Sequence, residues 1–372
     1  MLKGYKYRIF PTAEQKDQLQ RYFGVNRLVY NLGLETKTVA YASNKKSISK
    51  YDLIKQLPGL REEFDYIKEC PSQVLQNSLI NLDTAYQNFF KGKGQFPKYK
   101  NKYAKQSITF PQGFEVSFND HTLKLPKLKE VAIDYHREFK GLPKRVTLTK
   151  TVTGKYYVSI LVDTQIEKPK QKPISMETTV GVDFGIKDLA ITSDGVAYEN
   201  KNFFKSQQKR LRVEQRSLSR KEKGSINREK QKLKVALLQE KIRNQRTDYL
   251  HKISTELINT YETIVLEDLA VSNMVTNHNL AKAISEMGWR ELRTMLEYKA
   301  EWHGKNLVII GRFEPSSKMC SNCGNNKKDL KLSDRTYDCD KCGNSINRDL
   351  NAAYNIKNIG VRNNPLYANV SH

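Results

Sequence analysis

The chain has 372 residues and a formal net charge of +24, from 64 Lys and Arg against 40 Asp and Glu. This length allows two or three domains and exceeds what one simple core usually supports. This large positive charge predicts a polyanionic partner. Nucleic acid is the first candidate and an anionic membrane surface is the second. No apolar run approaches the ~20 residues that span a bilayer, and the first residues lack a signal peptide's apolar stretch. Five cysteines fit a reducing cytosol, where we expect this protein.

The N-terminal part predicts a strand followed by helices. Residues 3–10 alternate charged and bulky side chains, as a short strand does. Thr12 and Gln15 have the spacing of a capping box, which predicts that a helix begins there. A second helix is predicted over residues 72–90, where apolar side chains recur at helical spacing. Its other side carries amides that suit adenine edges in DNA or form an ordinary polar face: Gln73, Gln76 and Asn77.

A basic, aromatic loop and a β-rich region follow. Over residues 91–103, lysines that include Lys98 and Lys100 alternate with aromatic residues, which suits phosphate contacts and base stacking. Residues 106–163 fall into short alternating runs separated by turn residues, which predicts a small barrel or sandwich. Residues 164–178 are polar and contain two prolines, which is typical of a linker.

The second half predicts strands, a basic helical pair and a late helix. Two or three strands are expected from residue 179, helices near 203–222 and 226–260, a buried strand at 261–268 and a last helix over 348–359. Residues 201–250 hold 16 Lys and Arg against 5 Asp and Glu. Such a block is either a solvated helix face or a phosphate-binding surface. We favour phosphate because arginine forks match its oxygens, and the residues concerned are Arg210, Arg212, Arg216 and Arg220.

Four cysteines near the C-terminus have the spacing of a zinc site. Cys320 and Cys323 form one CxxC pair, and Cys339 and Cys342 form a second pair, with 15 residues between the two pairs. Two chance pairs or two disulfides are the alternatives, but this spacing favours tetrahedral zinc. Four thiolates leave no open position for water, so the zinc would be structural.

Three acids stand out by context. Asp183 lies inside an apolar strand, where a carboxylate is costly unless it is paired or binds a metal. Glu267 ends a strand and Asp349 lies in the first turn of a helix, so strand-end exposure and the helix dipole would explain each alone. Together, three carboxylates can hold two Mg²⁺ or Mn²⁺ ions for phosphodiester hydrolysis. The strand period of two places Asp268 on the face opposite Glu267.

Several motifs in this order resemble the TnpB family of transposon-encoded, RNA-guided DNA endonucleases, which are related to type V CRISPR effectors. The RuvC-like nuclease half is matched by GVDFGIKDLAITSDG, VLEDLAVSNM, SSKMCSNCG, DCDKCG and NRDLNAAYNI. The N-terminal half is matched by YKYRIFPTAEQ and PSQVLQNSLINLDTAYQNFFKGKGQFPKYK. The resemblance implies that Asp183, Glu267 and Asp349 are catalytic and that the four cysteines bind zinc. It also shows one departure, since many members have an acid where this chain has Asn347.

The resemblance implies a multidomain α/β protein with an added β-barrel. The expected parts are a β-barrel wedge (1–10 and 104–165), a helical recognition domain (11–103), a linker (166–178), a RuvC-like nuclease domain of RNase H-type fold (179–314 and 344–372) and an inserted zinc ribbon (315–343).

The implied function is an RNA-guided DNA endonuclease encoded by an insertion sequence. It would cut double-stranded target DNA next to a short flanking motif by two-metal-ion hydrolysis. Its cofactors would be Mg²⁺ or Mn²⁺, structural Zn²⁺ and a guide RNA from the transposon end, in a monomeric ribonucleoprotein of the bacterial cytosol or nucleoid. Two alternatives remain: an RNA-guided repressor without nuclease activity, and a transposase that joins strands directly. The complete set of three acids favours the nuclease over the repressor.

Overall fold

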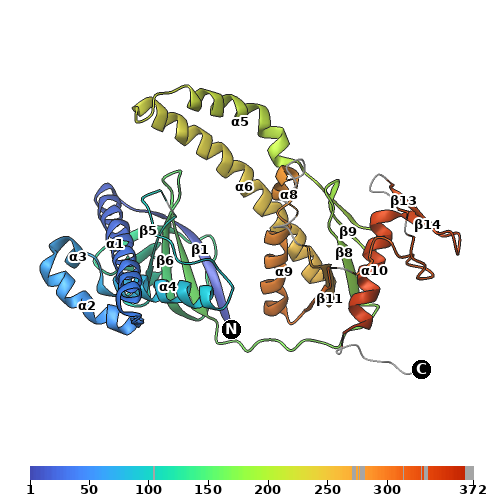
Figure 1. Cartoon of the computed structure of the whole chain (residues 1–372), viewed down its shortest axis with the longest axis horizontal. Helices are drawn as coiled ribbons and strands as arrows, with labels where there is room; N and C mark the ends of the chain where they lie inside the picture. Colours follow the sequence, from blue (N-terminus) through green and yellow to red (C-terminus); the bar gives the residue numbers. More distant parts are fainter. Residues whose placement is uncertain are drawn as a thin grey trace. The chain divides into compact units, whose positions relative to one another are not determined.

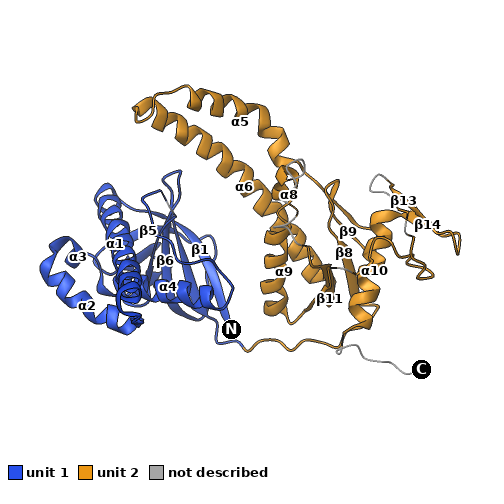
Figure 2. Ribbon diagram, viewed as in Figure 1, with its two compact units in different colours: residues 1–166 blue, residues 167–372 orange. Residues whose placement is uncertain are grey.

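The structure is a computed structural model that describes residues 1–103, 105–269, 274, 276, 281–312, 314–327, 329–330 and 334–364. The chain forms two compact units, residues 1–166 and 167–372 (Figure 2). Figure 1 labels the helices and strands of each unit. No described helix is both long and apolar enough to cross a membrane.

The first unit is built on a seven-stranded antiparallel sheet in the order β2-β6-β7-β1-β5-β4-β3. Alternate residues of the central strands are buried, as in β7, so one face of the sheet carries the core. The strands are β1 (Leu2–Phe10), β2 (Gln106–Phe110), β3 (Glu115–Ser117), β4 (Thr122–Leu125), β5 (Lys129–Asp134), β6 (Leu142–Lys150) and β7 (Tyr156–Asp163).

Four helices lie between β1 and β2 in the sequence. They are α1 (Ala13–Asn44), α2 (Lys50–Glu63), α3 (Asp65–Glu69) and α4 (Ser72–Phe90). Both hydrogen bonds of the Thr12–Gln15 capping box are present, which confirms the predicted start of α1. The sequence pattern did not predict α2 and α3. The proline inside α2 and the five-residue length of α3 weaken any helical signal there.

The sheet of the first unit does not close into the predicted barrel. Among the described residues, the two outer strands β2 and β3 each pair with one neighbour only. A helix covers part of the β2 edge, since the Asn26 side chain of α1 donates a hydrogen bond to the Ser107 carbonyl at 3.3 Å. A covered edge is protected without closure. Short alternating strands therefore predicted the sheet correctly and its closure wrongly.

The second unit is built on a five-stranded mixed sheet in the order β10-β9-β8-β11-β12. The central strands β8, β11 and β12 run parallel, whereas β9 and β10 are antiparallel to their neighbours. Their bounds are β8 (Thr179–Asp183), β9 (Asp188–Thr192), β10 (Ala197–Glu199), β11 (Thr263–Glu267) and β12 (Asn306–Ile310).

Helices cover both faces of this sheet (Figure 1). Helices α6 (Ile226–Thr260), α8 (Ala281–Met287) and α9 (Trp289–His303) share one apolar core with it, and α10 (Arg348–Arg362) packs on the other face through Ile356. Helix α5 (Phe203–Ser219) packs against α6 through a separate small core. The cysteine-rich region adds β13 (Thr336–Asp338) and β14 (Ser345–Asn347). The stretch predicted as a linker packs on this unit, where Ile174 is buried and Lys172 pairs with Glu262.

Candidate active site and zinc site

Two of the three predicted catalytic acids end neighbouring parallel strands. Asp183 is the last residue of β8 and Glu267 is the last residue of β11. The strand register pairs Val182 with Leu266, so the two acids follow at the next position of each strand. Asp349 lies in the first turn of α10, the helix that packs on this sheet.

The side chains of these two acids lie on the α10 face of the sheet. A Cβ built on Gly181 of β8 would approach the Ala353 carbonyl of α10 to 2.2 Å, so Gly181 faces α10. A Cβ built on Gly360 of α10 would approach Val265 of β11 to 2.2 Å, so Val265 faces α10 as well. Because side chains alternate along a strand, Asp183 and Glu267 face the same way. The fold therefore gathers the three acids at one end of the sheet.

The electrostatics of this site favour a bound cation. Burial, then Asp349, then Glu267 raise the pKa of Asp183 to about 8, against the lowering effect of Arg348. Burial and Asp268 raise the pKa of Glu267. None of the three acids forms an ion pair with a described residue. Sequence reasoning missed Arg348, although it directly precedes Asp349.

Among the described residues, the cysteines form the one group of three or more ligands whose atoms all lie within 4.8 Å of one another. Three carboxylates can hold two divalent ions about 4 Å apart. Hard carboxylate oxygens fit Mg²⁺ or Mn²⁺.

Asn347 gives helix α10 its start. Its side-chain oxygen accepts hydrogen bonds from the backbone N–H groups of Asp349 and Leu350, at 3.0 and 3.1 Å. An aspartate, which the resemblance led us to expect at this position, could make the same cap. The departure from the family pattern therefore leaves the helix start intact.

The four cysteines form a compact site in which two chain turns face each other. The Cys320 and Cys342 sulfurs lie 3.7 Å apart, and those of Cys323 and Cys339 lie 3.6 Å apart. Four sulfurs at ~2.3 Å from a tetrahedral zinc ion would lie about 3.8 Å apart. In both turns the glycine after the second cysteine has a positive φ, and its N–H donates to the first cysteine's carbonyl at 2.9 Å. The geometry fits Zn²⁺.

Cys339 and Cys323 differ in pKa, and therefore in how readily they form the thiolate that binds a metal. The backbone N–H of Cys342 contributes most to lowering the pKa of Cys339 to about 6. The Asn325 N–H lowers the pKa of Cys323, but burial and the three neighbouring thiols outweigh it and raise that pKa to about 12. Several thiolates at this spacing repel each other, so a cation that neutralises them would stabilise the module.

Two buried asparagines of α10 connect this module to the acid site. Asn351 donates to the Met319 carbonyl at 2.7 Å and accepts from the Ser321 N–H at 2.9 Å. Asn355, one turn later, donates to the Ser316 carbonyl at 2.7 Å. Asn351 is two residues from Asp349 and is fully buried. Sequence reasoning missed both, although two asparagines one turn apart on a helix were a visible signal.

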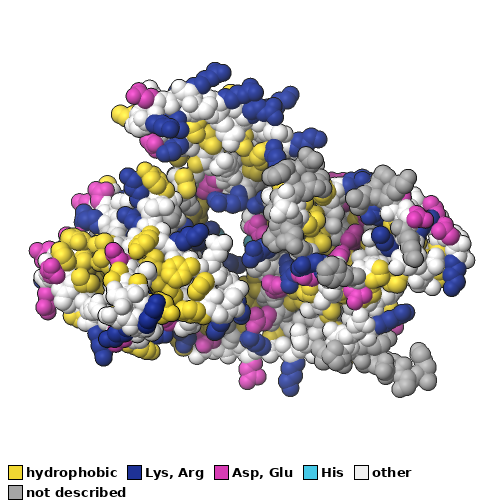
Figure 3. Space-filling view, in the orientation of Figure 1, with side chains coloured by type: hydrophobic (Ala, Val, Ile, Leu, Met, Phe, Trp, Pro, Cys, Tyr) yellow, Lys and Arg dark blue, Asp and Glu magenta, His cyan; other side chains and the backbone are white. Residues whose placement is uncertain are grey.

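The predicted nucleic-acid contacts differ in accessibility. Gln76 is exposed on α4, whereas Gln73 and Asn77 are half-buried, and Asn77 accepts from the Asn81 side chain at 3.1 Å. Lys98 is exposed, but the Lys100 ammonium lies 3.7 Å from the centre of the Tyr30 ring. Burial lowers the pKa of Lys100. Figure 3 shows Lys and Arg side chains along the α5–α6 pair, and the four predicted arginines in and directly after α5 are exposed: Arg210, Arg212, Arg216 and Arg220.

An aromatic cluster at the end of α4 was only partly predicted. Phe96 lies edge-on to Phe89 and Tyr86, with ring centres 5.4 and 5.5 Å apart. Phe90 contacts Phe89 and Tyr86 and is 77% exposed. The surrounding stretch, residues 84–114, holds six lysines and no acid. Exposed aromatic rings among lysines can stack on nucleobases while the lysines contact phosphate.

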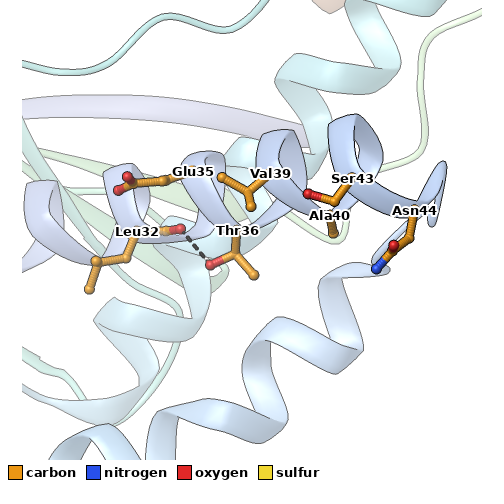
Figure 4. Close-up of a pocket in the computed structure, with 7 residues that line it drawn as sticks. All are labelled: Leu32, Glu35, Thr36, Val39, Ala40, Ser43 and Asn44. Carbon is orange, nitrogen blue, oxygen red and sulfur yellow. Dashed lines mark hydrogen bonds between the residues drawn. The ribbon is translucent and has the colours of Figure 1, made fainter.

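A groove along α1 contains none of the predicted site residues. Figure 4 shows its lining, in which the Thr36 hydroxyl donates to the Leu32 carbonyl at 2.8 Å. The lining residues are Leu32, Glu35, Thr36, Val39, Ala40, Ser43 and Asn44.

Three family matches cover parts of the chain. Residues 159–278 match OrfB_IS605, described as "Probable transposase". Residues 289–356, which include the cysteine module, match the "Cas12f1-like, TNB domain" family. Residues 1–46 match a family described as a helix-turn-helix domain, where the structure has β1 and the single helix α1.

Relatives match along almost the whole chain. A Streptomyces pristinaespiralis protein is 37% identical over 364 residues, and the match covers 96% of this chain and 89% of the relative's length. Its name provisionally describes it as an RNA-guided DNA endonuclease. InsQ of Escherichia coli K12, named in the same way, is 34% identical and covers 95% and 91%. TnpB-like protein L770 of Acanthamoeba polyphaga mimivirus is 24% identical and covers 96% and 73%.

Solved structures show the same fold at low sequence identity. The Cas12f1 chain from a complex with sgRNA and target DNA has a TM-score of 0.64 at 13% identity, covering 98% of this chain and 99% of its own. The mini-RNA-guided endonuclease CRISPR-Cas phi3 has a TM-score of 0.54 at 10% identity, covering 98% and 93%. Together with the relatives above 30% identity, these matches establish that the chain belongs to the TnpB family.

Proposed function

We propose that this protein is an RNA-guided DNA endonuclease that uses two divalent ions held by Asp183, Glu267 and Asp349. The observation that carries the proposal is the placement of the acids: two end adjacent parallel strands in register, and the third begins the helix on the same face. The names of the two relatives above 30% identity support the same activity.

The chemistry follows from the acid set. When bound, two Mg²⁺ or Mn²⁺ ions supply an activated water and stabilise the leaving 3′-oxygen. Metal binding would have to displace the proton that Asp183 holds at neutral pH because of its raised pKa of about 8. The strands hold Asp183 and Glu267 at a constant separation, and the Asn347 cap fixes the turn that carries Asp349. The four cysteines would hold one structural Zn²⁺ ion.

The nucleic-acid partners would be a guide RNA from the transposon end and double-stranded DNA with a short flanking motif. Base pairing with the guide would carry most sequence information. The exposed arginines of α5 would neutralise phosphates, and the Phe89–Phe90–Phe96 cluster with Lys98 would stack on unpaired bases. Gln76 and its neighbours Gln73 and Asn77 on α4 would contact the flanking motif. Lys100 is left out because its ammonium is held against Tyr30.

The domain assignment remains part of this proposal. A β-rich wedge (1–10 and 104–165) and a helical recognition domain (11–103) would bind nucleic acid. The nuclease domain (179–314 and 344–372) would have the RNase H-type fold, with the zinc ribbon (315–343) inserted before α10. The active species would be a monomeric ribonucleoprotein of the bacterial cytosol or nucleoid.

A cleavage assay with copurified RNA tests the proposal. Wild-type protein should cut target DNA only with Mg²⁺ or Mn²⁺, and Asp183→Ala should bind the same DNA with unchanged affinity but not cut it. Glu301→Ala is the matched control, because its carboxylate is exposed on α9 and its pairing with Lys168 is worth at most ~1 kcal/mol. Cleavage at the wild-type rate by Asp183→Ala would refute the metal-site assignment.

The same assay separates the alternatives. Guide-dependent binding by the wild type without any cutting would indicate a repressor. Joined strands among the products would indicate a transposase. Guide-dependent double-strand breaks without joined products would support the nuclease.

A further inference from the structure

The residue after Glu267 is held by two arginines from different elements. Asp268 follows the end of β11, and its backbone N–H donates to the Ile310 carbonyl of β12 at 3.2 Å. Its two carboxylate oxygens bind different partners, the Arg293 guanidinium of α9 and the Arg312 guanidinium just after β12, each at 2.9 Å. Both oxygens of Asp268 are therefore engaged in charged hydrogen bonds.

Each arginine is itself fixed by a second contact. The Nε group of Arg293 donates to Glu297 one turn later on α9, at 3.0 Å. The Nε group of Arg312 donates to the backbone carbonyl of Asp268 at 3.4 Å. Arg312 thus holds both the side chain and the main chain of Asp268.

Helix α9 also supports the strand that ends in Asp183. Its first residue, Trp289, is 3% exposed, and its ring stacks on the Phe184 ring with centres 6.4 Å apart and an angle of 21°. Phe184 directly follows Asp183, as Asp268 directly follows Glu267. The first turns of α9 therefore contact the chain just beyond both strand acids, from the face opposite α10.

We propose that Asp268, Arg293 and Arg312 form a clamp that positions the Glu267 carboxylate for metal binding. They are positioning residues, because their charged groups bind one another while Glu267 faces the other side of the sheet. The clamp rests on the proposed function, because only that function makes Glu267 a metal ligand. It adds two arginines that neither the family likeness nor the sequence pattern singled out, and it gives Asp268 a role.

The clamp should matter far more for metal binding than for stability. Its side chains are 35%, 37% and 45% exposed for Arg293, Asp268 and Arg312, and exposed ion pairs contribute only ~0.2–1 kcal/mol each. Loss of groups that orient metal ligands, by contrast, typically costs about 10- to 100-fold in metal affinity or activity. The two effects can therefore be separated.

The first test compares metal affinity with DNA affinity in the guide-loaded full chain. Arg293→Ala and Arg312→Ala should each raise the Mn²⁺ concentration for half-maximal single-turnover cleavage by about tenfold or more. Mn²⁺ binding measured by electron paramagnetic resonance without DNA should weaken in parallel, and DNA affinity should stay the same. Arg293→Lys keeps one charged contact and should recover most of the Mn²⁺ affinity. Arg290→Ala, an exposed arginine of the same helix, is the control and should match the wild type.

A double-mutant cycle tests whether the residues act as a unit. Asp268→Ala combined with Arg293→Ala should weaken Mn²⁺ binding no more than the stronger single change. Multiplied effects, or weaker DNA binding at unchanged Mn²⁺ affinity, would overturn the clamp and point to direct phosphate contacts. If the wild type bound Mn²⁺ but cut no DNA, the proposed function would fail while the Mn²⁺ measurements still tested the clamp.

Discussion

Replacing Gly181 by alanine should displace the helix that carries Asp349. Gly181 lies in β8, two residues before Asp183, and the backbone of α10 passes directly over it. An added Cβ would lie 2.2 Å from the Ala353 carbonyl oxygen and 2.5 Å from the Lys357 nitrogen. Both are main-chain atoms in the middle of a helix, so no side-chain rotation can relieve the overlap. The helix or the strand must move.

The size of the movement follows from the contact distances. An ordinary contact needs at least 3.4 Å. The distance from the added Cβ to the Ala353 carbonyl oxygen must therefore grow from 2.2 Å by about 1.2 Å. Overpacking of this kind costs about 1–3 kcal/mol of folding stability. In a domain of this size that lowers the melting temperature by roughly 2–4 °C per kcal/mol. A catalytic group misplaced by about 1 Å can cost about 100-fold in rate.

Two measurements check this reasoning, thermal unfolding and single-turnover cleavage at saturating Mg²⁺. We expect Gly181→Ala to lose several degrees of melting temperature and about two orders of magnitude in cleavage rate. Gly4→Ala is the control, because it is also a strand glycine but has nothing within 4 Å of the added Cβ. A Gly181→Ala protein with the melting temperature and rate of the wild type would show that the close approach of α10 is not needed.

Three further predictions concern the metal sites and the aromatic cluster. Cys339→Ser should lose zinc by elemental analysis and slow cleavage because Asn351 would lose its anchor, and full zinc content with full activity would contradict this. In metal-free protein, the raised pKa of Asp183 means that the folded state binds its proton more tightly, so stability falls as pH rises from about 4 to about 8. Asp183→Asn should therefore melt higher than the wild type at pH 8 and equally at pH 4, and equal melting at both would refute the shift. Phe90→Ala should weaken single-stranded nucleic-acid binding about tenfold by anisotropy, whereas Phe90→Tyr and the exposed-site control Tyr41→Ala should not.

Local sequence signals predicted several elements, including the two strands that carry Asp183 and Glu267. The capping box at Thr12, the amphipathic stripe of α4 and the apolar runs around Asp183 and Glu267 all correspond to observed elements. The cysteine spacing predicted a cluster that the structure contains. These signals are readable because each depends on neighbours within a few residues.

Features that depend on distant contacts were not predictable in this way. The partly covered β2 edge of the first sheet involves a contact between Asn26 and Ser107, 81 residues later. The clamp depends on Arg293 and Arg312 reaching Asp268, and no spacing rule connects those positions. Strand alternation did predict that Asp268 faces away from Glu267, and its contact with α9 agrees.

The three acids consequently differ in what sets their positions. The positions of Asp183 and Glu267 are set by strand pairing, so the register of β8 and β11 determines their separation. Asp349 depends on tertiary contacts at two points of α10: Asn351 bonded to the cysteine module, and the close approach at Gly181. Removal of zinc and addition of a methyl group at Gly181 should therefore change the same distance, the one from Asp349 to the two strand acids. The cysteine module is then a support for the third metal ligand as well as a separate small fold.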